Sequence, residues 1–301
     1  MRARYYVYSD LSGEFDPDRL RCPLSVFGSL WVPCGYGEPL FHALQEGRYN
    51  NEKFFKGKVH FRKLRGKGRR SPRAHTARNW LRHYKSEAWK HVYVKLTIII
   101  RAHPIYELRR FGYDKDFPNL KPQVVEHNRW LRLNLEGAKA YFFRDHGDIP
   151  IDLFLDRRPS TLSVVPHHPK YEFVKYMRKR LPEDGLYLNE IHGLQLLTDR
   201  EYGVNRDEEC LQFIDILVGA FAHWVRRGRF PELAGKEPVL SELSDWARDL
   251  LLDARANSSL RSRLSISLFP FIDRSSGCNG WVDLLTDRLP DWMLVPLGQC
   301  I

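Results

Sequence analysis

Cys210-Leu-Gln-Phe-Ile-Asp-Ile-Leu-Val-Gly-Ala-Phe-Ala222 is the run of this 301-residue chain that says most about its fold. Leu211, Ile214 and Val218 recur at the spacing of one helix face, so the run predicts a helix packed on a core. Asp215 falls inside the same apolar stripe. An unpaired buried carboxylate is strongly unfavourable, so Asp215 requires a cation, a set of hydrogen bonds or a metal ion opposite it.

The composition predicts a soluble, cytoplasmic protein. Hydrophobic residues make up 43% of the chain, enough for one large or two modest cores. We find no run of about 18 apolar residues that could span a bilayer, and the first apolar stretch is too short for a signal peptide. The five cysteines are odd in number and show no C-x-x-C spacing, so neither a disulfide framework nor a zinc site is indicated.

The net charge of +11 is concentrated in one segment. Between Lys53 and Arg73 lie ten lysines or arginines and no acid, with three glycines that keep the backbone pliant. Such a cluster favours contact with the phosphate backbone of RNA or DNA. The alternative is a solvated loop whose charge only aids solubility. The candidate nucleic-acid-binding residues are Lys58, Arg62, Lys63, Arg65, Lys67, Arg69, Arg70 and Arg73.

Strand and helix patterns alternate along the chain, which predicts an α/β fold. Strands are expected at 5–10, 24–32, 91–100, 149–157 and 187–199, and helices at 71–89, 120–144, 171–181, from 205 onward and at 240–256. Ser71 before Pro72 fits a helix N-cap, and Asn205 with Glu208 three residues later fits a capping box. In the strand at 149–157, Asp152 and Asp156 share one face because side chains alternate.

Three other aspartates stand at the ends of expected strands: Asp10, Asp156 and Asp199. Each has an ordinary alternative, since Asp10 could form a turn and the other two could pair with neighbouring arginines. Carboxylates on a first strand, a later strand and a following helix can nevertheless converge at one end of a sheet. Such sets hold Mg²⁺ or Mn²⁺ ions, two of them about 3.5–4 Å apart, that activate water for phosphodiester attack.

Four pieces of the chain resemble the DUF3800 family of unknown function. They are Tyr8-Ser-Asp10-Leu-Ser-Gly13, Val59-His60-Phe61-Arg-Lys-Leu64, Asp156 after an apolar strand, and Leu211-Gln212-Phe-Ile-Asp215-Ile-Leu-Val-Gly219-Ala220. The resemblance implies a ribonuclease H-like mixed sheet flanked by helices and a metal-dependent nuclease with Asp10, Asp156 and Asp215 as metal ligands. By analogy it also suggests a bacterial defence system or a mobile element.

The chain departs from the family pattern in two places. The family's Asp-Glu-Ser-Gly is Asp10-Leu-Ser-Gly13 here, which keeps the metal-binding acid and loses the glutamate. Where the family has an acid before His-Phe, this chain has Lys58. The fourth carboxylate of a ribonuclease H-like site is therefore missing there. Asp199, Asp152 or His60 could complete the site, although His60 could equally be an ordinary strand histidine or a phosphate contact.

Two functions from different classes follow. The preferred one is a metal-dependent nuclease. Its ribonuclease H-like domain would span residues 1–228, with a basic insertion at about 53–73. The candidate catalytic residues are Asp10, Asp156, Asp215, Asp199 and His60. The alternative is a nucleic-acid-binding or assembly subunit that has the same fold and no hydrolytic activity. Residues 229–301 are expected to form a C-terminal, partly helical extension that packs on the core and could mediate a homo-oligomer or bind a companion protein.

Overall fold

A seven-stranded mixed sheet organises the chain, which confirms the α/β fold class. The structure is a computed structural model that describes residues 4–12, 23–50, 52–103, 106, 112–156, 169–194, 202–234, 237–273, 278–287, 289–290 and 293. The strands of the main sheet are β1 (Tyr5–Ser12), β2 (Leu24–Pro33), β5 (Tyr93–Ile100), β6 (Ile149–Asp156), β7 (Leu186–Leu194), β8 (Leu264–Asp273) and β9 (Cys278–Asp283). A separate two-stranded ribbon is formed by β3 (Tyr49–Asn50) and β4 (Lys53–Phe54).

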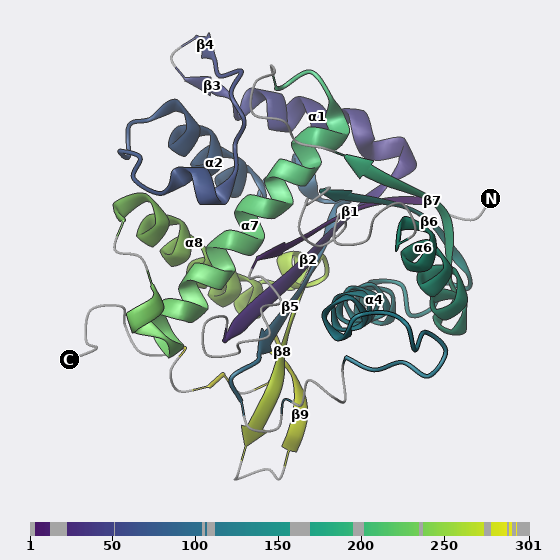
Figure 1. Cartoon of the computed structure of the whole chain (residues 1–301). Helices are drawn as coiled ribbons and strands as arrows, with labels where there is room; N and C mark the ends of the chain where they lie inside the picture. Colours follow the sequence, from purple (N-terminus) through teal and green to yellow (C-terminus); the bar gives the residue numbers. More distant parts are fainter. Residues whose placement is uncertain are drawn as a thin grey trace.

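The strand order of the main sheet is β7-β6-β1-β2-β5-β8-β9. Strands β1, β2 and β5 form an antiparallel meander, and β6 and β7 add to its β1 side in parallel. On the other side β8 runs parallel to β5, and β9 pairs antiparallel with β8. The described residues after 229 thus supply two α-helices and also two strands of the main sheet (Figure 1).

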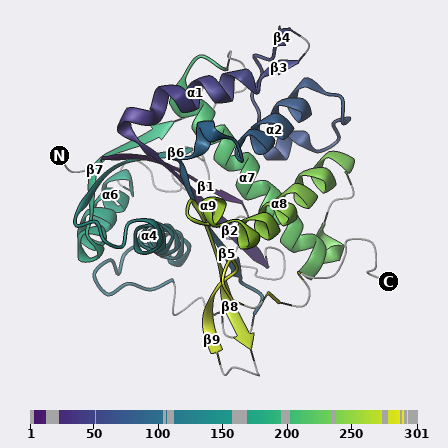
Figure 2. The same ribbon diagram turned by 180° about the vertical axis from the view of Figure 1, so that it is seen from behind.

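Helices cover both faces of the sheet (Figures 1 and 2). On one face lie α1 (Gly37–Glu46), α2 (Pro72–His83), α7 (Arg206–Arg229), α8 (Pro238–Ala256) and the short α9 (Ser258–Arg261). On the other lie α4 (Pro122–Phe142) and α6 (Pro169–Arg180). Within the described residues, no helix combines the length and apolar character needed to cross a membrane.

Side-chain alternation along the strands divides the interior into two cores. In β6, Phe154 belongs to the core beneath α7, whereas Ile151, Leu153 and Leu155 belong to the core beneath α4 and α6. The expected partition of this strand is therefore confirmed. Since Asp156 lies two residues after Phe154, its Cβ is directed to the α7 face.

The two expected helix starts are confirmed. The Asn205 side chain accepts hydrogen bonds from the amides of Asp207 and Glu208 at the start of α7. The Ser71 hydroxyl accepts one from the amide of Ala74 at the start of α2. The helix expected at 71–89 is shorter, because α2 ends at His83 and 87–89 form a separate 3₁₀ turn.

Helix α7 crosses β1 and β2 at very close range. A Cβ placed on Gly28 of β2 would lie 2.2 Å from Cγ2 of Val218 and 3.0 Å from Cδ1 of Ile214. Glycine is required there because no side chain fits between the helix and the strand. The apolar face of α7 that includes Ile214 and Val218 therefore packs directly on β2, at the residue opposite Asp10 of β1.

We predict that Gly28→Ala lowers the free energy of unfolding by about 1–3 kcal/mol, since the added methyl overpacks the α7 contact. The matched control is Gly35→Ala, because a Cβ at Gly35 meets nothing within 4 Å. Urea denaturation followed by circular dichroism measures both. Equal midpoints for the two variants would show that α7 does not lie this close to β2.

Candidate functional site

A row of polar side chains on α7 binds the backbone of the basic segment. Gln212 Oε1 accepts a hydrogen bond of 2.6 Å from the amide of Val59. Asp215 Oδ2 accepts one of 2.6 Å from the amide of Phe61. The two acceptors are three residues apart on one helix face, and the two amides are two residues apart on an extended chain. Asp215 therefore has a structural partner, which accounts for part of its presence on an apolar helix.

The next polar residue toward the start of α7, Glu209, forms a buried ion pair with Arg48. Both side chains are fully buried, with 2.5 Å between Arg48 Nε and Glu209 Oε2. The same guanidinium donates to the carbonyls of Phe55 and Gly57, at 2.8 and 2.9 Å. Burial raises the pKa of Glu209, and the charge of Arg48 opposes that rise. Arg48 thus ties α7 to the start of the basic segment.

Asp10 and Asp156 lie side by side at the carboxyl ends of two parallel strands. Ser9 of β1 is paired with Leu155 of β6, so the residues that follow each of them are neighbours. Asp10 is also paired with Gly28, over which α7 passes. Both strand acids belong to the face that α7 covers. Asp10 is 8% exposed, Asp156 is half-buried, and Asp215 on the helix above is 8% exposed.

Lys58 carries the charge that these acids face. Its side chain is 8% exposed. Burial lowers the pKa of Lys58, and the carboxylates of Asp156, Asp215 and Asp10, in that order, act to raise it. Because electrostatic effects weaken with distance, these effects indicate that the three acids lie near Lys58. The three predicted metal ligands therefore lie in the neighbourhood of one lysine.

We call Asp10, Asp156 and Asp215 the acidic centre. His60 lies beside it, next to Asp215. Its Nδ1 accepts a hydrogen bond of 3.1 Å from the amide of Arg62. The same Nδ1 is 3.5 Å from Asp215 Oδ2. In this arrangement His60 caps the short 3₁₀ turn at Phe61–Leu64.

The arrangement does not fit a ready-made metal site. Among the described residues, no three acidic, histidine or cysteine side chains are grouped so that they could hold a metal ion. One oxygen of Asp215 is bound to Phe61, and the charge at the centre is supplied by Lys58. Asp152 is bound instead to Arg4 and Asn189, at 2.6 and 2.8 Å. Asp199 lies outside the described residues.

The basic segment divides into an exposed part and a structural part. The exposed cations are Lys53, Lys56, Arg62, Arg65, Lys67, Arg69 and Arg70. Lys63 is half-buried, and its charge lowers the pKa of Lys58, which puts it beside the acidic centre. Arg73 is also half-buried; it donates to the carbonyl of Lys58 at 2.7 Å, and burial lowers its pKa. Lys58 and Arg73 therefore hold the segment in place.

No protein-family model matches the chain, and no curated protein matches its sequence. The resemblance to the DUF3800 family accordingly depends on its four short motifs.

The sequence draws attention to Asp10, Asp156 and Asp215, but it does not predict that Lys58 lies near them. Lys58 stands where the DUF3800 pattern has an acid before His-Phe. That position alone could have indicated a lysine near the acidic centre. Glu209 and Gln212 precede Asp215 by six and three residues, a spacing that puts all three on one helix face. Nothing near Arg48 in the sequence indicates that it is the partner of Glu209.

We predict that Glu209→Gln destabilises the protein by about 3–5 kcal/mol, because it leaves the buried charge of Arg48 uncompensated. The double variant Arg48→Met, Glu209→Leu should recover part of that loss, since both buried charges are then removed. Glu242→Gln is the control, since Glu242 pairs with Arg78 at the surface. Urea denaturation measures all three, and a loss for Glu209→Gln no larger than for Glu242→Gln would contradict the role of the ion pair.

Proposed function

We propose that this chain is a nucleic-acid-binding protein with a ribonuclease H-like fold, in which Lys58 neutralises the acidic centre in place of divalent metal ions. The observation that carries the proposal is the buried ammonium of Lys58, on which three carboxylates act together. It belongs to the alternative class expected from the sequence, a binding subunit without metal-dependent hydrolysis.

The strand order supports the fold part of the proposal. Three antiparallel strands are followed by two strands that add in parallel beside the first, giving the order β5-β2-β1-β6-β7 within the larger sheet. This is the arrangement that a ribonuclease H-like fold requires. The acids also occupy the elements that the DUF3800 resemblance implies: the first strand, the next strand beside it, and the helix that crosses them.

Electrostatics favour a centre that binds no second cation. Two unit charges 4 Å apart interact by on the order of 4 kcal/mol at an effective dielectric constant of about 20. A divalent ion beside Lys58 would be repelled about twice as strongly, because it carries two charges. Lys58 also stands at the sequence position where the family pattern has an acid, so the chain has one ligand fewer and one cation more.

The exposed cations support the nucleic-acid part of the proposal. Arg65, Lys67, Arg69 and Arg70 lie on one short stretch that the α7 contacts hold beside the acidic centre. Phosphate groups would bind these side chains without sequence preference, with an affinity that falls as salt increases.

The convergence of Asp10, Asp156 and Asp215 favours a second candidate, a Mg²⁺- or Mn²⁺-dependent nuclease in which Lys58 must first leave the centre. This candidate requires cleavage by the natural chain. The binding proposal requires none.

We predict that replacing both Arg65 and Lys67 with Glu weakens binding to labelled single-stranded and double-stranded RNA and DNA. The salt dependence of binding should also fall, by about one unit for each phosphate group that the variant no longer binds. The control replaces Lys115 and Lys121, which are exposed elsewhere, with Glu. Fluorescence anisotropy at several salt concentrations gives both quantities. If the two double variants weaken binding equally, only net charge matters and the segment is not the binding surface.

We predict that Lys58→Glu creates a divalent-ion site whose affinity for Mn²⁺ exceeds that of the natural chain by at least about 100-fold. Adding Asp10→Asn to Lys58→Glu should abolish the gain. Isothermal titration calorimetry measures binding, and thermal melting verifies that each variant is folded. Lys58→Gln is the uncharged comparison, and it should give a smaller gain.

A nuclease assay on the same proteins separates the two candidates. The binding proposal expects no cleavage by the natural chain in Mg²⁺ or Mn²⁺. Cleavage by the natural chain that is abolished in both Asp10→Asn and Asp215→Asn would overturn that proposal and establish the nuclease.

A further inference from the structure

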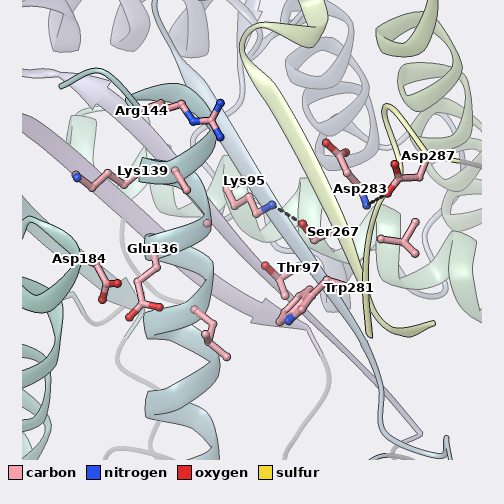
Figure 3. A pocket seen from close by; sticks show the side chains of 14 residues that line it. Lys95, Thr97, Glu136, Lys139, Arg144, Asp184, Ser267, Trp281, Asp283 and Asp287 are labelled. Atoms are coloured by element: carbon pink, nitrogen blue, oxygen red, sulfur yellow. Dashed lines mark hydrogen bonds between the residues drawn. The ribbon is translucent and has the colours of Figure 1, made fainter. Parts of the chain in front are cut away.

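A pocket of about 690 Å³ lies on the face of the sheet opposite the acidic centre (Figure 3). It is bounded by α4 on one side and by β5, β8 and β9 on the other. A volume of this size is typical of small-molecule sites, which range from about 300 to 1,000 Å³. None of the acids or cations of the proposed nucleic-acid site lines it, so what it binds is a separate question.

Lys95 of β5 is the buried cation of this pocket. Its side chain is 5% exposed, and its Nζ donates hydrogen bonds to Ser265 Oγ at 2.8 Å and Ser267 Oγ at 2.5 Å. An ammonium has three hydrogens, so these two bonds leave one for a ligand. Gly137 of α4 provides the space, because a Cβ there would lie 3.1 Å from Lys95 Cε. A lysine in a strand of this apolar character is as unusual as Asp215 in its helix.

Two hydroxyls supply further donors beside Lys95. Ser267 Oγ accepts from Lys95, and Thr97 Oγ1 accepts from Asn134 Nδ2 at 2.9 Å. Each hydroxyl therefore keeps its own hydrogen for another acceptor. Thr97 and Ser267 are paired across β5 and β8, so their side chains lie next to each other. One N–H and two O–H groups thus converge, which suits a group with several anionic oxygens.

Trp281 of β9 supplies an aromatic surface on the same face. It is 43% exposed and packs against Trp130 and Phe269, with ring centroids 5.7 and 5.0 Å away. Ser267 is paired with Asp283, two residues along β9 from Trp281. Two residues of a strand span about 6.6 Å. A pentose could bridge the distance between the hydroxyl pair and the indole ring.

The acids of the pocket limit the ligand to one anionic group. Glu136, Asp184, Asp283 and Asp287 line it together with the cations Lys139 and Arg144 (Figure 3). Burial, and then Asp184, raise the pKa of Glu136 to about 7. Four carboxyl groups would repel a nucleic-acid strand with a phosphate at every residue. They suit a small ligand that presents hydroxyl or amino hydrogens at its other end.

We propose that this pocket binds a nucleoside monophosphate, with its phosphate at Lys95, Thr97 and Ser267 and its base against Trp281. Burial lowers the pKa of Lys95 to about 8 although the charge of Asp283 acts to raise it, and a bound phosphate would add to this partial counter-charge. The inference does not depend on the proposed nucleic-acid binding, which involves the other face of the sheet.

The test is isothermal titration calorimetry of the full chain with AMP, GMP, CMP and UMP, and with adenosine and inorganic phosphate as partial ligands. At least one monophosphate should bind, and adenosine and phosphate should each bind at least about tenfold more weakly than it. Lys95→Met and Trp281→Ala should each weaken binding at least about tenfold. Tyr113→Ala, an exposed aromatic residue outside the pocket, should leave it unchanged.

Three outcomes of these titrations would overturn the inference. Failure of all four monophosphates to bind at millimolar concentration excludes the ligand class. Phosphate that binds as tightly as the nucleotides, with no effect of Trp281→Ala, shows that no base is recognised. Nucleotide binding that is weakened by replacing Arg65 and Lys67, and by neither pocket variant, assigns it to the basic segment. Because Trp281 is exposed, Trp281→Ala and Trp281→Phe remain informative if Lys95→Met fails to fold.

Discussion

The hydrogen bonds from the backbone of the basic segment to α7 are the constraint on which the rest of the site depends. A segment with ten cations would otherwise remain extended in solvent, because its charges repel one another and its glycines resist ordering. Gln212 and Asp215 bind two of its amides inside the protein, where an unmet bond would cost about 1–3 kcal/mol. Arg48 fixes the start of the segment through a pair of charges that are both fully buried. Lys58 lies between these attachments, so its place among the acids follows from them.

Among the described residues, one buried lysine lies on each face of the sheet, and the two have different surroundings. Three carboxylates act on Lys58 and offset part of the cost of burying its charge. Lys95 has two serine hydroxyls and the more distant charge of Asp283, which leave its charge only partly compensated. A compensated cation stabilises the fold and competes with other cations, whereas an under-compensated one attracts an anion. For this reason we propose that Lys58 takes the place of a metal ion and that Lys95 binds an anionic ligand.

Much of the fold could be predicted from local patterns, because these elements follow local rules. The caps at Ser71 and Asn205 and the alternation in β6 are each decided within a few residues. The Asp215 stripe likewise predicts a helix on a core. Helix α1 is absent from the sequence predictions, although Leu40, Ala43 and Leu44 are buried at helical spacing along it. The pairing of Arg48 with Glu209, and the hydrogen bond from Val59 to Gln212 that fixes the place of Lys58, join residues more than 150 positions apart, which no local pattern contains.

The C-terminal strands also change which strand is the edge of the sheet. Without β8, the apolar strand β5 would expose unpaired backbone N–H and C=O groups, with which another polypeptide could pair. With β8 and β9 added, that row is paired, and the edge moves to β9, a strand of six residues. The partner of β5 follows it by more than 160 residues, so this edge stays open until those residues have been synthesised. Protection of β5 during synthesis would therefore fall to a chaperone or to the speed of the final folding step.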